Sequence, residues 1–244
     1  WAGAPSSELE TVYYSKEFSP DVWDGMGTGG GFIGIPSWDA SKIVAVRNYF
    51  NEVVVFKDRD IFRIYGTYPG EFGVAKVHGE DGPSSAKSIV TYKDRVYFFN
   101  RNGICFYDGM RARPLGDNKI KRILAGLNQS FLSLCCAARM GSKLYFAVTS
   151  ADSTVNDTVI EYDADTKDYM VRTGINATCF LRLDNRLLFG STDGGIYVYG
   201  EGRGYPASNM DSYWVTPRLD LGAKYTRKYS TTVYTHAKGE GQLH

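Results

Sequence analysis

The sequence predicts an all-β fold, and within that class a β-propeller of about five four-stranded antiparallel blades with one short helix. Three observations predict it: a repeat of roughly 45 residues, second strands that are apolar on both faces, and a composition rich in tyrosine and glycine. The 244 residues include 18 Tyr and 27 Gly, which suits many strands joined by tight turns. This length fits one large all-β domain or two small domains.

The repeat is clearest where the second strand of each unit begins. These positions are Val53, Val96, Leu144 and Leu187, at intervals of 43, 48 and 43 residues. Each follows a turn, at Phe50-Asn51, Lys93-Asp94, Gly141-Ser142 and Asp184-Asn185 respectively. Four short antiparallel strands at a period near 40–50 residues are typical of a propeller blade.

The third and fourth strands of the units follow the same pattern. The third strand closes on a tyrosine that we expect to pack between sheets: Tyr65, Tyr107, Tyr162 and Tyr199. The expected fourth strands are residues 74–77, 111–115, 168–171 and 213–215. Pro114 has no N–H to donate, so its strand is expected at an outer edge.

The domain interpretation follows from these units. Residues 1–222 form the propeller, with units at about 41–80, 86–125, 132–173 and 177–217 and with 1–40 as a partial or irregular blade. Residues 223–244 form a closing strand or begin a further domain, and residues 150–157 form an enlarged loop. The start at Trp1 and the stop at His244 indicate a piece of a longer polypeptide.

One helix is expected at residues 118–127. Ile120, Ile123, Leu124 and Leu127 share one face of it, and Asp117 is a suitable N-cap. An amphipathic helix of this kind is expected to cover the edge of a blade.

Charge and cysteine content exclude several classes of partner. The chain has 28 basic and 27 acidic residues, so it has no broad attraction for nucleic acid or anionic lipid.

No apolar run approaches the roughly 18 residues of a membrane span, and no signal peptide is present. Cys105, Cys135, Cys136 and Cys179 have no zinc-ligand spacing. We expect reduced, buried thiols and assembly in a cytoplasm.

No motif in the chain predicts catalysis. The glycines at 25–30 match G-x-G-x-x-G, but without the strand before and the helix after that a dinucleotide site requires. Residues 163–168 resemble a calcium loop faintly and read better as a hairpin turn, because Lys167 takes a ligand position. The histidines, His78, His236 and His244, are far apart. The sequence therefore predicts no catalytic residue, no metal ligand and no cofactor.

Exposed aromatic residues are the candidates for a protein interface, because aromatic side chains anchor interfaces well. The residues expected in this role are Trp23, Phe32, Trp38 and Tyr68. For most of the N-terminal aromatic residues, a place in a core is favoured slightly over an interface.

The first half of the chain resembles a known family. The resemblance rests on Trp1-Ala-Gly-Ala-Pro5-Ser6-Ser7-Glu8-Leu9, Tyr14-Ser15 and Ser19-Pro20-Asp21-Val22-Trp23, followed by residues 53–66, 82–85 and 96–109. These segments resemble the packaged-DNA stabilisation and tail-hub proteins of short-tailed bacteriophages, over about residues 1–125. The resemblance implies a virion component at the head–tail or tail-tip region, with protein partners and no catalytic residues.

Three functions remain open at this point. The first is a non-enzymatic structural protein of a phage or prophage particle that docks other virion proteins and is assembled in the bacterial cytoplasm. This function involves no small-molecule substrate, and it leaves open whether the chain also forms a homo-oligomer. The second is a propeller hydrolase or lyase acting on glycans, which a cluster of acids at the axis would indicate. The third is a glycan- or peptide-binding module, which repeated aromatic pockets between blades would indicate.

Overall fold

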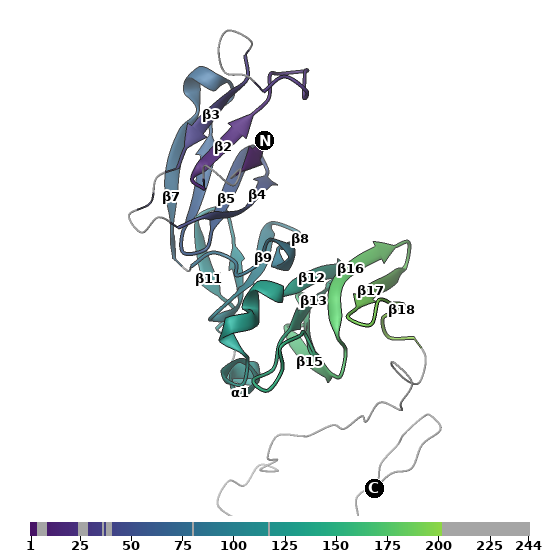
Figure 1. Ribbon diagram of the computed structural model, residues 1–244. Coiled ribbons are helices and arrows are strands. Elements are labelled where there is room, and N and C mark those ends of the chain that lie inside the picture. The colour runs from purple at the N-terminus through teal and green to yellow at the C-terminus, as the bar shows by residue number, and fades with distance from the viewer. Residues whose placement is uncertain are drawn as a thin grey trace, which may run out of the picture. The chain divides into compact units, whose positions relative to one another are not determined.

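The computed structural model describes residues 1–3, 9–23, 29–35, 37, 41–79, 81–116 and 118–201 (Figure 1). The chain divides into two units, Trp1–Asn209 and Met210–His244, and all the described residues belong to the first. Their regular structure consists of strands with a few short helical turns, which confirms the all-β prediction.

The strands form five successive groups. These are β1 (Ala2–Gly3), β2 (Thr11–Tyr14) and β3 (Gly31–Gly34); β4 (Ile43–Tyr49), β5 (Glu52–Lys57), β6 (Ile61–Tyr65) and β7 (Gly73–Gly79); β8 (Val90–Tyr92), β9 (Arg95–Asn100), β10 (Gly103–Tyr107) and β11 (Arg111–Pro114); β12 (Cys136–Met140), β13 (Lys143–Val148), β14 (Thr158–Asp163) and β15 (Asp168–Thr173); and β16 (Ala177–Leu183), β17 (Arg186–Ser191) and β18 (Ile196–Val198). Within each group, neighbouring strands pair antiparallel in sequence order.

The five predicted blades are resolved only in part. Three groups are four-stranded meanders, but the first and last groups contain three described strands each, and the strand expected at 213–215 lies outside the described residues. The second and third groups join into one eight-stranded sheet, because β7 and β11 pair in parallel at Arg111 with His78 and Ala112 with Gly79. His78 lies within β7, and Pro114 lies just beyond this paired stretch.

The turns between first and second strands confirm the repeat. The residue that begins each two-residue turn has a positive φ: Phe50 (50°), Lys93 (51°), Gly141 (62°) and Asp184 (51°). The strand residues on either side pair directly, as Tyr49 does with Glu52 and Tyr92 with Arg95. A positive φ in a short hairpin matches the right-handed twist of the flanking strands, so the same local geometry recurs four times.

Each hydrophobic core lies between two successive groups. One core joins β1–β3 to β4–β7, the next joins β4–β7 to β8–β11, a third joins β8–β11 to β12–β15, and the fourth joins β12–β15 to β16–β18. The second strands supply two cores each by alternation. In β9, Val96 and Phe98 face the preceding group, whereas Tyr97 and Phe99 face the following one.

The four residues that define the repeat occupy equivalent places. Val96, Leu144 and Leu187 are buried in the core shared with the preceding group, and Val53 packs at the margin of the corresponding first core. Because the side of the sheet and the position in the strand agree at all four residues, the sequence repeat corresponds to a structural repeat.

The tyrosine repeat holds in three groups and is wrong in one. Tyr107, Tyr162 and Tyr199 are buried opposite Val96, Leu144 and Leu187.

In the second group the residue opposite Val53 is Ile64, not Tyr65. Tyr65 is 45% exposed, and its ring lies over Gly73 of β7. A shift of one position in a strand moves a side chain to the other face, so Tyr65 does not pack between sheets.

The predicted helix is shorter than expected. A 3₁₀ turn at Asn118–Ile120 leads into α1 (Lys121–Ala125), and three other 3₁₀ segments lie at Pro69–Glu71, Ala86–Ser88 and Gln129–Leu134. Asp117 lies outside the described residues. The predicted apolar face is confirmed, since Ile120 and Leu127 are buried in the third core while Ile123 and Leu124 pack against it.

The buried tyrosines predict loss of stability in alkali. Burial raises the pKa of Tyr107 to about 12, and burial and the nearby Glu161 carboxylate raise that of Tyr199. When folding raises the pKa of a tyrosine, the stability that its neutral phenol contributes is fully present below the ordinary tyrosine pKa near 10. That contribution is lost as the pH rises through the pKa of the folded state. We expect urea midpoints to fall steeply between about pH 10 and pH 12.

The variant Tyr107→Phe isolates one of these groups. Its urea midpoint is expected to fall less steeply over the same interval, because no phenol remains at that position to ionise. Parallel curves for the variant and the parent protein would show that the ionisation of Tyr107 does not contribute.

Candidate binding pocket

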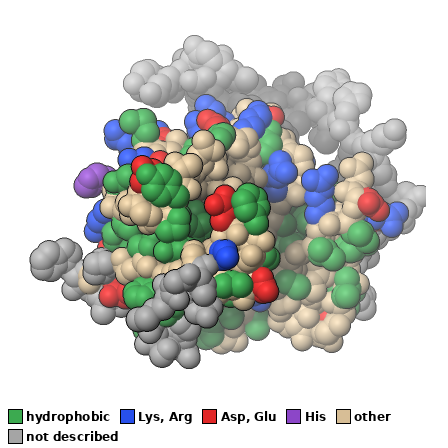
Figure 2. Space-filling model, turned by 90° about the horizontal axis from the view of Figure 1, so that it is seen from above, with side chains coloured by type: hydrophobic (Ala, Val, Ile, Leu, Met, Phe, Trp, Pro, Cys, Tyr) green, Lys and Arg blue, Asp and Glu red, His purple; other side chains and the backbone are tan. Residues whose placement is uncertain are grey.

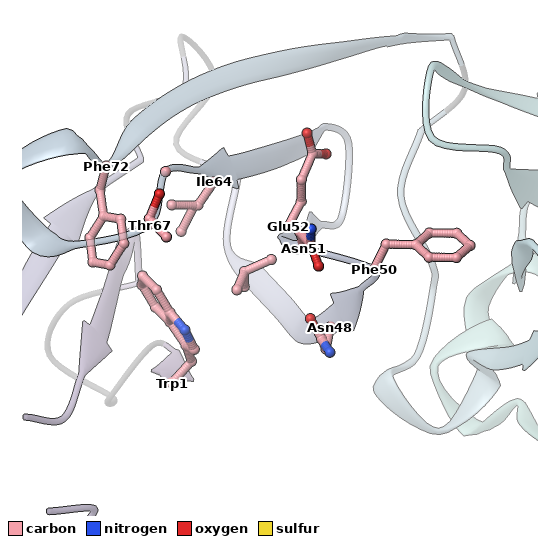
Figure 3. Close-up of a pocket in the computed structure, with 10 residues that line it drawn as sticks. Trp1, Asn48, Phe50, Asn51, Glu52, Ile64, Thr67 and Phe72 are labelled. Carbon is pink, nitrogen blue, oxygen red and sulfur yellow. The ribbon is translucent and has the colours of Figure 1, made fainter. Parts of the chain in front are cut away.

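A pocket of about 260 Å³ opens where the turn between β4 and β5 meets the loop between β6 and β7 (Figure 3). Its lining residues are Trp1, Asn48, Phe50, Asn51, Glu52, Val53, Ile64, Gly66, Thr67 and Phe72. Most of them come from the ends of one group of strands, so the register of β4–β6 determines which side chains meet there.

An aromatic cluster forms one side of the pocket. The ring of Trp1 lies 5.2 Å from that of Phe72 and 5.4 Å from that of Tyr14, and Tyr14 and Phe72 are 5.3 Å apart, centroid to centroid. Tilted and edge-on contacts at these distances are the favoured arrangements of aromatic pairs. Figure 3 shows Trp1, Ile64 and Phe72 turned toward one another.

The opposite side of the pocket is polar. Asn48 lies near the end of β4, Asn51 in the turn that follows and Glu52 at the start of β5. The carboxylate of Glu52 accepts a hydrogen bond from Arg63 at 3.1 Å on the opposite face of the sheet from Val53 and Ile64. Phe50 stands beside them and points away from the pocket in Figure 3, with 71% of its surface exposed. The pocket thus combines an aromatic wall with polar side chains that can hydrogen-bond, the usual chemistry of a small binding site.

The predicted interface residues lie elsewhere. Phe32 of β3 is 66% exposed, and the centroid of its ring lies 6.0 Å from that of the Tyr13 ring. Tyr68 is exposed and donates a hydrogen bond to Glu71 at 2.5 Å, and Trp23 is partly exposed. Trp38 lies outside the described residues. None of the three described residues lines the pocket, so the sequence predicted separate exposed rings and missed this site.

A second apolar surface lies on the last group of strands. Leu181 and Leu183 of β16 and Ile196 of β18 are more than half exposed. Cys179 of β16 is exposed too, so the prediction that the strand cysteines are buried is wrong at this position. Cys105, Cys135 and Cys136 are buried as expected. The difference arises because, among the described residues, no further group of strands covers this face of β16.

The cysteines provide a direct test of this surface. Burial raises the pKa of Cys136 to about 12 and that of Cys135 well above its ordinary value, so neither forms a reactive thiolate near neutral pH. We expect a disulfide reagent to modify one thiol per native chain rapidly and all four in urea. Cys179→Ser should remove the fast reaction, and a fast reaction that persists in this variant would contradict the assignment.

Two buried ionic networks connect neighbouring groups. Lys57, fully buried at the end of β5, donates to the carbonyl of Ile35 at 2.5 Å and to Glu10 at 2.8 Å. The same ammonium group holds the pKa of Glu10 below its usual value. In the other network Glu161 of β14, also buried, accepts a hydrogen bond from the hydroxyl of Tyr199 at 2.8 Å and pairs with Arg172.

The remaining motifs are structural where the structure describes them. Asp163 accepts backbone hydrogen bonds from Asp165 and Thr166, and Lys167 has a φ of 61°, so residues 163–168 form the predicted hairpin turn. Glycines 25 and 27 lie outside the described residues, as do His236 and His244. Among the described residues, no group of three or more His, Cys, Asp or Glu side chains is arranged to hold a metal ion.

Surface charge is mixed on the face seen from above. Figure 2 shows hydrophobic side chains there, interspersed with basic and acidic ones. Such a face has no large field of one sign. Within the described part of the chain, no helix has the length and apolarity to cross a bilayer.

Comparisons with known proteins give structural likenesses only. No protein-family model matches the chain, and no curated protein matches it. BamB from Moraxella catarrhalis is similar with a TM-score of 0.45 and 14% identity, over 68% of this chain and 48% of that one. The chain thus spans about half the length of that protein.

Two other solved structures are similar. The computationally designed Ika4 protein has a TM-score of 0.43 and 17% identity, over 67% of this chain and 93% of that one. The AfRom2 CNH domain has a TM-score of 0.34 and 10% identity, over 78% of this chain and 73% of that one.

Proposed function

We propose that this chain is a non-enzymatic structural protein of a phage or prophage particle, where it is a rigid scaffold that docks other virion proteins in the tail or head–tail region. In this proposal the five groups of strands are successive blades of a β-propeller. The observation that carries it is the series of four cores, each shared by two successive groups.

Shared cores support a docking role because they make neighbouring groups rigid relative to each other. Protein interiors are packed as densely as organic crystals, so adjoining sheets with a common core resist displacement. The turns and loops at the ends of the strands are then held at fixed positions, which is the arrangement on which binding surfaces are commonly built. The resemblance of residues 1–125 to phage virion proteins supports the particle as the setting.

The test is the location of the chain after particle assembly. We expect it to co-sediment with intact particles purified from the source culture, and antibodies against it to label the tail or head–tail region in electron micrographs. Recovery of the chain only from the soluble fraction of a lysate that contains intact particles would contradict the proposal. A particle protein of known location, labelled in parallel, controls for antibody access.

A further inference from the structure

The pocket beside Trp1 coincides with a missing tyrosine. Tyr107, Tyr162 and Tyr199 each lie opposite the first apolar residue of the second strand. Ile64 holds the same position opposite Val53, and both of these residues line the pocket. An aliphatic side chain stands here in place of a phenol ring, and open space lies beside it.

The other three positions show what an occupied site looks like. Each tyrosine ring contacts an aromatic ring of the preceding group: Tyr107 lies 5.0 Å from Tyr49, Tyr162 lies 6.3 Å from Tyr97, and Tyr199 lies 5.1 Å from Tyr145. Two of the hydroxyl groups donate to an oxygen acceptor, Gly109 carbonyl at 2.9 Å and Glu161 carboxylate at 2.8 Å. An aromatic neighbour and an oxygen acceptor are therefore the recurring partners of the ring.

Both kinds of partner are present at the pocket. Trp1 and Phe72 supply aromatic faces and edges on one side. On the other side the side-chain oxygens of Asn48, which pairs with Val53 across the sheet, and of Asn51 are acceptors. The volume of about 260 Å³ exceeds that of one phenol ring, so a ring attached to a peptide backbone has room to enter.

Phe50 presents an exposed ring at the rim of the pocket. It is a bulky residue with a φ of 50°, and most of its surface is exposed. An exposed ring held in this way beside a pocket is suited to contact with a bound polypeptide.

We propose that this pocket binds a single aromatic side chain, best a tyrosine, presented by a partner protein. The partner's ring takes the place that Tyr107, Tyr162 and Tyr199 fill from within the chain, with its hydroxyl group directed at the polar side. This inference rests on the docking role proposed above for the identity of the partner, but the binding chemistry is testable on the isolated chain.

The probe is p-cresol, which is the tyrosine side chain alone, titrated into the chain and followed by NMR. We expect saturable binding with shifts confined to the lining residues, and weaker binding of 4-methylcyclohexanol, which lacks the planar ring. Ile64→Tyr fills the space from inside the chain and should weaken p-cresol binding at least tenfold. Trp1→Ala should weaken it as well, and this change lies outside the cores, so the fold does not depend on it.

The control is Leu181→Ser on the last group of strands, which should bind p-cresol as the parent protein does. The inference is overturned if p-cresol does not bind, if Ile64→Tyr and Trp1→Ala both leave its binding unchanged, if the saturated ring binds equally well, or if a monosaccharide binds the pocket more tightly than p-cresol. Failure here leaves the sedimentation result intact, so it is distinguishable from failure of the proposed docking role.

Discussion

Gly79→Ala is expected to destabilise the protein by about 4 kcal/mol, because two costs combine at this position. Gly79 has a φ of 134°, which side chains rarely adopt, and a Cβ there would lie well inside van der Waals contact with the carbonyl oxygen of Ala112. Ala112 is buried in the core between β4–β7 and β8–β11. The two strands that join the eight-stranded sheet would have to separate.

Urea unfolding followed by circular dichroism measures this effect, and Gly141→Ala is the matched control. Gly141 also has a positive φ, 62°, but nothing lies within 4 Å of its would-be Cβ. The control should cost about 1–2 kcal/mol from the backbone alone. If the two variants lose the same stability, the close approach of β7 to β11 is not a constraint on the fold.

Glu161→Ala is expected to cost about 3 kcal/mol, because it breaks a buried ion pair by removing one partner. Glu161 is 5% exposed, pairs with Arg172 and accepts the hydrogen bond of Tyr199. Arg172 also lies over the ring of Tyr199, 5.7 Å from its centroid. Removal of the carboxylate leaves a half-buried cation and a buried hydroxyl group without their acceptor.

Two comparisons separate burial from charge. Glu161→Gln keeps an acceptor for the hydroxyl of Tyr199 and should lose less stability than the alanine variant. Asp165→Ala removes the exposed ion pair with Lys93, 2.6 Å long, and the hydrogen bond from the hydroxyl of Tyr92, and it should cost much less stability, because water screens exposed charges. Equal losses for Glu161→Ala and Asp165→Ala in urea unfolding would show that the buried network adds nothing beyond a surface pair.

The local features of the fold were predictable from the sequence. The four turns and the second strands that follow them were recognised because a two-residue turn and an apolar run are encoded by adjacent residues. Val96, Leu144 and Leu187 are buried at equivalent positions for the same reason. The parallel pairing of β7 with β11 was not predicted, because it joins His78 and Arg111 across a stretch of chain without a local signal.

The pocket was missed because it depends on strand register. Tyr65 matches the other tyrosines in the sequence, yet Ile64 is the residue opposite Val53. The loops between second and third strands differ in length from unit to unit, so residue spacing does not reveal this shift. The exposure of Cys179 was also beyond local pattern, since burial of a strand face is determined by what packs on it.

The sharing of every core between two groups has a consequence for dissecting this protein into fragments. Within the described part of the chain, no group of strands has a hydrophobic interior of its own, because the buried faces of one meet those of the next. A fragment cut to contain one group alone would present bare apolar faces to water and aggregate. A pair of consecutive groups, such as residues 81–173, would keep the one core that its members share but would still expose the faces that belong to the two flanking cores.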